Sequence, residues 1–153
     1  PGAFNVWRAG GKWWGLLAIF LDGFKALIPV AIAVHGVGIS GWGVTAVGVA
    51  PVFGHAYSPF LRCNGGKALA VTFGAWAGVT IWWGPTVLGI AFALWLKLLK
   101  VDSWAVFFGL LTLLAAAVAM QPTGPILLMW AVICAVVMWK HRAELTERPW
   151  QGG

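Results

Sequence analysis

Charged residues are scarce in this chain of 153 residues, and acidic residues are the scarcest of them. Only 9% of the residues are charged, with 4 acidic side chains against 10 Lys and Arg, whereas a soluble domain carries about 25% charged residues. Hydrophobic residues make up 61% of the chain and the mean hydropathy is +0.87, more apolar surface than a soluble domain of this size could bury. This composition excludes an ordinary soluble fold and favours a protein that spans a lipid bilayer.

Several kinds of chemistry are excluded by missing residues. The two cysteines, Cys63 and Cys134, form no disulfide or metal-binding motif. The chain has no His-Glu-x-x-His motif, no cluster of metal ligands and no Gly-x-Ser-x-Gly motif, and 4 acidic residues leave few candidates for a paired-carboxylate mechanism. We therefore expect no metal and no cofactor. The chain also begins without Met or a signal-peptide pattern, so we expect a natural segment before residue 1.

What the chain does have is a series of apolar runs, which predict about six membrane-spanning helices, since a span needs roughly 20 apolar residues. We expect the two shortest runs to take residues from their flanks or to lie in a thinned bilayer. Gly84-Pro85 and residues 121–125 are predicted turns. The prediction is an all-α, polytopic membrane bundle, with spans over residues 13–34, 37–53, 68–83, 86–96, 104–120 and 126–139.

The basic residues outside the predicted spans are unevenly distributed among the predicted connections. They lie before the first span, in every second connection and after the last span, while the other connections carry no charge. The positive-inside rule places the basic connections in the cytoplasm, so the net charge of +6 indicates membrane topology rather than nucleic-acid binding. A site at this face would suit an anion such as phosphate. The basic residues outside the predicted spans are Arg8, Lys12, Arg62, Lys67, Lys97, Lys100, Lys140, Arg142 and Arg148.

One polar loop interrupts the apolar runs at residues 54–70, GHAYSPFLRCNGGKALA. Gly65 and Gly66 would let the backbone approach an anion, and Lys67 stands near the start of the next predicted helix, where the dipole attracts phosphate. The loop is not a nucleotide-binding P-loop, because Leu61 and Ala68 replace residues that this motif needs. A flexible interfacial turn is the alternative interpretation.

Three further groups are candidates for chemistry. His55 follows an apolar run, and His141 lies between two basic residues that disfavour its protonated form, so either could act as an acid or a base. Both could equally be interfacial residues at the end of a span. Asp22 and Lys25 lie inside the first span at a spacing that pairs them on one helix face, either as a structural pair or as part of a site.

Several segments resemble the bacterial membrane glycerol-3-phosphate acyltransferases of the PlsY type. The loop of residues 54–70 resembles the second signature of that family, and the opening PGAFNVWR is similar to the end of the first. Residues 21–25 are similar to the Asp-x-x-Lys that follows it, Ser103 falls in a Ser-containing element, and residues 140–144 resemble the terminal basic-His-Arg-x-Asn element. These matches keep the family's order along the whole chain.

The resemblance implies a membrane bundle of about seven spans. Residues 1–153 would then form a single domain that lacks its first transmembrane helix. It implies acyl transfer from acyl-phosphate to the 1-hydroxyl of glycerol 3-phosphate at the cytoplasmic face of the bacterial inner membrane, giving lysophosphatidic acid. By the resemblance, the catalytic residues are His141 and Ser103, and the substrate-binding residues are Asn5, Arg8, His55, Gly65, Gly66 and Lys67.

The chain departs from the family pattern at three positions. Asn64 stands where the family has a basic residue, Val106 where it has a second Ser, and Glu144 where it has Asn, which adds a negative charge near the anion site. Two other hypotheses therefore stay open: a noncatalytic paralogue, and a transporter or binding protein for a small phosphorylated metabolite. The sequence does not determine the acyl-chain preference or the oligomeric state.

Overall fold

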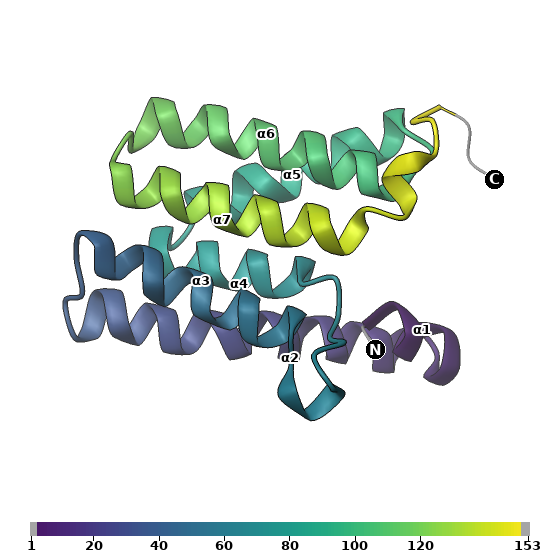
Figure 1. Cartoon of the computed structure of the whole chain (residues 1–153), viewed down its shortest axis with the longest axis horizontal. Helices are drawn as coiled ribbons and strands as arrows, with labels where there is room; N and C mark the ends of the chain where they lie inside the picture. Colours follow the sequence, from purple (N-terminus) through teal and green to yellow (C-terminus); the bar gives the residue numbers. More distant parts are fainter. Residues whose placement is uncertain (1–2, 151–153) are drawn as a thin grey trace.

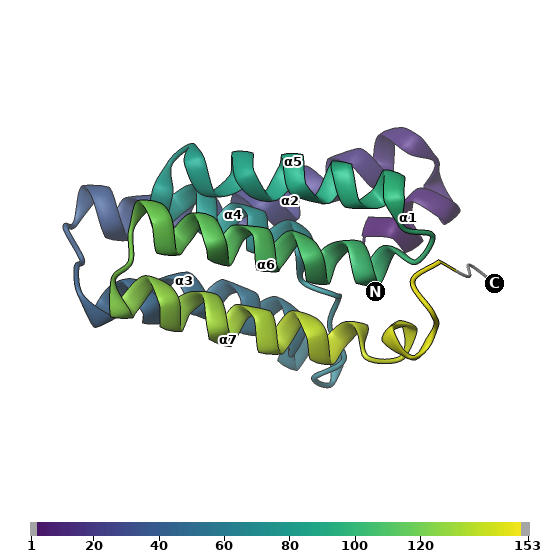
Figure 2. The same cartoon turned by 90° about the horizontal axis from the view of Figure 1, so that it is seen from above.

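The computed structural model of the protein describes residues 3–150, and their side chains from residue 6 onward. Within this part of the chain all regular structure is helical, which confirms the all-α prediction. The long helices run roughly side by side (Figures 1 and 2). They are α1 (Ala3–Gly10), α2 (Lys12–Ala31) with its π-helical continuation η1 (Ile32–Gly36), α3 (Trp42–Ala56), α4 (Leu69–Thr80), α5 (Trp83–Leu98), α6 (Asp102–Met120) and α7 (Gly124–His141); η2 (Pro59–Leu61) and η3 (Glu144–Thr146) are short turns.

Each predicted span corresponds to one helix from α2 to α7. Four helical segments in residues 3–150 are long and apolar enough to cross a membrane: Lys12–Gly36, Trp42–Leu61, Asp102–Met120 and Gly124–His141. The last of these confirms that the short sixth run takes residues from its flanks. Helices α4 and α5 have 12 and 16 residues, so their crossing of the bilayer stays a prediction.

Two predicted boundaries were wrong. The break between the third and fourth spans lies at Ile81 and Trp82, where Ile81 has a φ of +63°, and Pro85 lies inside the first turn of α5. Proline is tolerated there because the first backbone N–H groups of a helix have no helical partner. The second span begins at Trp42 rather than residue 37, because Gly38 and Gly41 form a turn with positive φ.

The closest helix packing is that of α4 on α2, and it depends on Gly74 and Gly78. A Cβ added to Gly74 would lie 2.0 Å from the carbonyl oxygen of Gly23, and one added to Gly78 would lie 2.7 Å from Cβ of Val30. Glycines four residues apart let two helix backbones approach closely, as in membrane helix pairs. This contact fixes α4 and the loop before it against α2.

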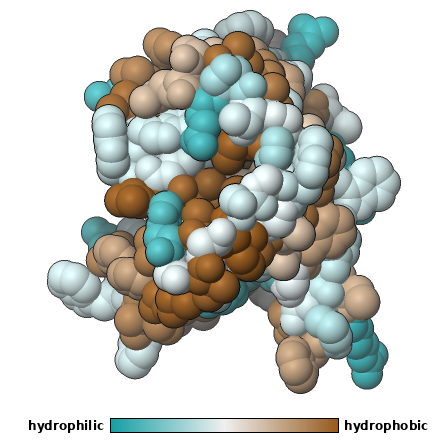
Figure 3. Space-filling model, turned by 90° about the vertical axis from the view of Figure 1, so that its left-hand side faces the viewer, coloured by the Kyte–Doolittle hydropathy of each residue, from teal (hydrophilic) through white to brown (hydrophobic). Residues whose placement is uncertain are grey.

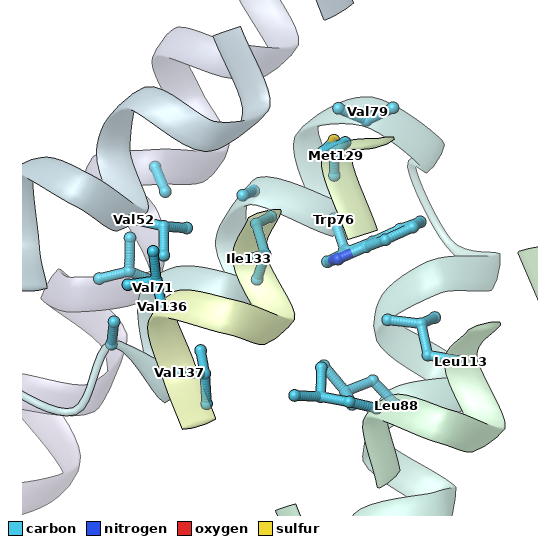
Figure 4. Packing of buried hydrophobic residues seen from close by; sticks show 14 of the residues in the cluster. Val52, Val71, Trp76, Val79, Leu88, Leu113, Met129, Ile133, Val136 and Val137 are labelled. Atoms are coloured by element: carbon cyan, nitrogen blue, oxygen red, sulfur yellow. The ribbon is translucent and has the colours of Figure 1, made fainter. Parts of the chain in front are cut away.

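The buried core receives side chains from every helix from α2 to α7. Figure 4 shows Val52, Trp76, Leu113 and Ile133 pointing into it from four different helices. Val106, the residue that stands in place of the family's second Ser, is 2% exposed and belongs to this core. A valine is suited to that position because its side chain is packed among apolar groups rather than in a polar site.

The outer surface of α2 is apolar. Phe20, Phe24, Ile28 and Ile32 recur every fourth residue and are each about half exposed, so they form one stripe along the helix. Such a stripe is unfavourable in water and favourable against lipid tails. The membrane-protein prediction is therefore supported by the surface as well as by the composition.

The two ends of the bundle differ in character. Figures 1 and 2 show α1, the loop between α3 and α4, the connection between α5 and α6, and the segment after α7 at the same end. We call this the basic end, because these are the segments that carry the predicted basic connections. The connections 37–41, 81–82 and 121–123 lie at the opposite end, which we call the bare end; hydrophilic side chains are few on its face in Figure 3.

Candidate active site

Three distant segments meet at Glu144 on the basic end. The Lys67 ammonium, in the loop before α4, donates to Oε1 of Glu144, and the Ser103 hydroxyl, at the start of α6, donates to Oε2. Ser103 is fully buried, whereas Glu144 and Lys67 are about half exposed. The structure thus brings Lys67 and Ser103 to the same carboxylate, and their roles toward substrate stay predictions.

The environment of Glu144 keeps its carboxylate charged. Burial alone would raise the pKa of Glu144, but hydrogen bonds from Lys67 and Ser103 and the positive charge of Lys67 outweigh burial, so the pKa is lowered. The carboxylate therefore presents two anionic oxygens to a lysine and a hydroxyl at neutral pH.

His141 is the last residue of α7 and is 4% exposed. Its Nδ1 lies 2.8 Å from the carbonyl oxygen of Val137. A carbonyl oxygen can only accept, so Nδ1 carries the hydrogen and Nε2 of the neutral ring has a free lone pair. Lys67, Glu144 and Asp102 are the charged groups that act electrostatically on the ring. The geometry thus gives His141 a proton-accepting nitrogen in the same neighbourhood as Lys67.

Asp22, Lys25 and His55 form a second polar cluster between α2 and α3. Nζ of Lys25 lies 2.5 Å from Oδ1 of Asp22, which confirms the predicted pair, and 2.7 Å from Nδ1 of His55. Nδ1 of His55 lies 3.6 Å from Oδ1 of Asp22. The pair is therefore not isolated, because it holds the histidine of the polar loop.

Gly65 and Gly66 connect the two clusters. A Cβ on Gly65 would lie 1.9 Å from the backbone oxygen of His55, and one on Gly66 would lie 2.4 Å from Nε2 of His55. The backbone N–H of Gly65 also donates to the carbonyl of Ala56 at 3.1 Å. The glycines are needed because the loop packs directly on the end of α3, a reason different from the anion contact that the sequence suggests.

The remaining predicted site residues lie on α1. Arg8 is exposed on this helix, which packs against α2 at the basic end. The backbone of Asn5 belongs to α1, but its side chain lies outside the described residues. The participation of Asn5 and Arg8 in the site stays a prediction.

A cleft of about 630 Å³ opens beside the second cluster. Its polar lining comes from Asp22, Lys25, His55 and Ser58, and Gly66 joins it to the loop that carries Lys67. The rest of the lining is mostly apolar and consists of Val6, Ala18, Leu21, Pro51, Gly54 and Leu61. A cleft with a polar end and apolar walls can accept an amphipathic molecule.

Comparison with known proteins agrees with this arrangement. The sequence profile of the glycerol-3-phosphate acyltransferase family matches residues 1–149. The chain belongs to the glycerol-3-phosphate acyltransferase family. It is 36% identical to the glycerol-3-phosphate acyltransferase of Aquifex aeolicus, over 95% of this chain and 76% of the relative. It is 43% identical to glycerol-3-phosphate acyltransferase 1 of Thermotoga maritima, over 58% of this chain and 44% of that relative.

Solved structures of this family share the fold. The chain superposes on PlsY (YgiH), an integral membrane glycerol 3-phosphate acyltransferase, with a TM-score of 0.82 for the glycerol 3-phosphate form. The TM-score is 0.83 for the lysophosphatidic acid form, and the sequence identity is 34% in both cases. The alignments cover 99% and 95% of this chain, but 78% and 74% of the solved chains. Membership of an integral membrane family confirms the predicted fold class.

Two features of the site were missed by sequence reasoning. Glu144 was recognised as an extra negative charge, but its bridge between Lys67 and Ser103 was not predicted. The contact between Lys25 and His55 was also not predicted, because 30 residues separate them and only the packing of α2 beside α3 brings them together. The one available signal was the position of Lys25 inside an apolar run, where a charge needs a partner.

Proposed function

We propose that the protein transfers an acyl group from an acyl-phosphate to the 1-hydroxyl of glycerol 3-phosphate, forming lysophosphatidic acid. The observation that carries the proposal is that Lys67 and Ser103, from distant segments, meet at the carboxylate of Glu144, three residues after His141, at one end of a membrane bundle. Family membership supports the acyltransferase activity. The two solved relatives, in glycerol 3-phosphate and lysophosphatidic acid forms, support the acceptor and the product.

In this proposal Lys67 and Arg8 hold substrate phosphate. A lysine ammonium binds phosphate oxygens through charge-assisted hydrogen bonds. Asn5, His55 and Ser103 donate or accept hydrogen bonds that orient the substrates. Gly65 and Gly66 hold the lysine loop against His55.

His141 removes the proton of the acceptor hydroxyl. As the 1-hydroxyl oxygen attacks the acyl carbonyl carbon, its proton passes to Nε2 of His141, the C–O bond to phosphate breaks, and phosphate leaves with the bonding electrons. Acyl-phosphate is already activated, so holding the two reactants together and neutralising their charges supplies much of the rate.

The cleft between α2 and α3 suits the acyl donor. Its apolar walls would receive the first part of the acyl chain, while Lys25 and His55 lie at its polar end. The remainder of the chain would extend into lipid. In this arrangement the basic end faces the cytoplasm of a bacterial inner membrane, where glycerol 3-phosphate is soluble.

The test is the release of phosphate from acyl-phosphate with and without glycerol 3-phosphate, using protein that includes any natural residues before Pro1. We expect release that depends on the acceptor, and Lys67→Ala should lower kcat/KM about 10²-fold or more, because it removes a phosphate ligand. Lys97→Ala is the matched control, since it removes the same charge from α5 at the basic end. Acceptor-independent activity, or full activity of Lys67→Ala, contradicts the proposal.

A further inference from the structure

Two donors that the proposed function gives to the substrates, Lys67 for phosphate and Ser103 for orientation, are occupied by a side chain of the protein itself. Lys67 and Ser103 each donate to a different oxygen of the Glu144 carboxylate. A phosphate monoester would offer these donors the same pair of anionic oxygens. The Ser103 hydroxyl has one hydrogen, so it cannot donate to Glu144 and to a phosphate at once, and the two anions compete for the Lys67 ammonium.

Glu144 is placed so that it can leave while Ser103 stays. Ser103 is fully buried at the start of α6, whereas the Glu144 side chain is 41% exposed on the short turn η3. The chain after this turn is held to the first turn of α6, because Trp104 Nε1 donates to the carbonyl of Glu147 at 2.8 Å. Rotation of the Glu144 side chain toward solvent therefore needs no movement of the backbone.

We propose that Glu144 is an affinity-determining residue: its carboxylate fills the phosphate position in the free protein and has to be displaced by the phosphate of the substrate. The inference rests on the proposed function, which gives Lys67 to substrate phosphate. Displacement separates an ion pair and brings two anions close together, so Glu144 weakens substrate binding. Its lowered pKa keeps this competitor charged at neutral pH.

The experiment measures the Kd of inorganic phosphate and of glycerol 3-phosphate for the purified protein by calorimetry, and KM for each substrate separately. We expect Glu144→Gln to lower the Kd of phosphate and one of the two KM values by roughly three- to ten-fold, and to raise kcat/KM. The substrate whose KM falls identifies which phosphate Glu144 displaces. Glu144→Asn makes the same charge change with a shorter side chain and repeats the test independently.

Two controls separate competition from a general effect of charge. Glu147→Gln removes one negative charge three residues along the chain and should leave both constants unchanged. In a Lys67→Ala background, Glu144→Gln should tighten phosphate binding clearly less than in wild type, because one of the two shared donors is gone. An equal gain in both backgrounds overturns the inference.

Other outcomes are equally decisive. If Glu144→Gln lowers kcat/KM through kcat, Glu144 accepts a proton in the reaction and the inference is wrong. If phosphate binds wild type and Glu144→Gln equally, while Lys67→Ala weakens it, the inference fails and the anion site of the proposed function stands. If acyl transfer is absent but Glu144→Gln still tightens phosphate binding, the inference survives and the proposed function fails.

Discussion

Single glycines in the polar loop set the distance between the loop and α3. Because Gly65 lies so close to the His55 backbone, a methyl group there has to push the loop away. We expect Gly65→Ala to lower the stability by about 1–3 kcal/mol and the activity by about tenfold or more, measured by thermal unfolding in detergent and by phosphate release. Gly89→Ala is the control, because its Cβ would meet only Phe73 at an ordinary 3.6 Å. A Gly65→Ala protein as stable and active as Gly89→Ala would contradict the packing described.

The contact between Lys67 and Glu144 should make stability depend on pH. A carboxyl group whose pKa is lowered by folding stabilises the protein above its unfolded pKa, and this contribution is lost as pH falls through the folded pKa. The pair is half exposed, so its contribution is small, about 0.2–1 kcal/mol. We expect the Tm difference between wild type and Glu144→Gln to be largest near neutral pH and to shrink as the pH falls below the ordinary Glu pKa of about 4.3. A difference that is constant across this range would show that Glu144 is not paired.

The residues of the site could be predicted from sequence better than their contacts. Lys67, Ser103 and His141 are recognisable by type and by motif, and the structure brings them into one neighbourhood. The bridging role of Glu144 could not be predicted, because it depends on how the chain turns after α7. Nothing in the local sequence specifies that turn, whereas the apolar run before it specifies the helix.

Helix α4 joins the basic loop to the bundle through a glycine surface. Gly74 faces the Gly23 carbonyl of α2 and Gly78 faces Val30, so both must stay small. We expect Gly74→Ala to destabilise the protein by about 1–3 kcal/mol in detergent, since a methyl group there forces α2 and α4 apart. Gly89→Ala, on the neighbouring α5, again serves as the control for the change in helix propensity. Equal unfolding temperatures for the two variants would contradict this interface.

Helix positions were predictable because a long apolar run in a membrane must satisfy its own backbone hydrogen bonds, which an α-helix does. Helix ends were less predictable, and the reasons are local. Gly84-Pro85 is a common turn signal, yet a proline is also accepted in the first turn of α5, and Ile81 makes the real turn with a positive φ that no sequence rule anticipates for a branched side chain. The spacing of Gly74 and Gly78 in α4 is a sequence signal for close helix packing, and it is independent of the length of the apolar run.

At the scale of the whole molecule, the distribution of charge gives the bundle its two unlike ends. Successive basic connections are separated by two predicted spans and so lie on the same side of the membrane, which was predictable without knowing how the helices pack. Which basic residues meet at their common end depends on the rotation of each helix, and that follows from side-chain packing in the core. The gathering of polar groups at one end favours a one-sided enzyme site over a path through the bilayer.

The proposed orientation can be tested with the thiol of Cys63, which is exposed in the polar loop at the basic end, while Cys134 lies half-buried in α7. In a Cys134→Ala protein, we expect a membrane-impermeant maleimide to label Cys63 in inverted inner-membrane vesicles but not in intact spheroplasts. Ser40→Cys, made together with Cys63→Ser and Cys134→Ala, places the thiol in an exposed connection at the bare end and should reverse the result. Labelling of Cys63 from outside intact spheroplasts would place the Lys67 site on the outer side of the membrane and contradict the proposed orientation. A phosphorylated substrate made in the cytoplasm could not reach such a site, because a charged molecule does not cross the bilayer unaided.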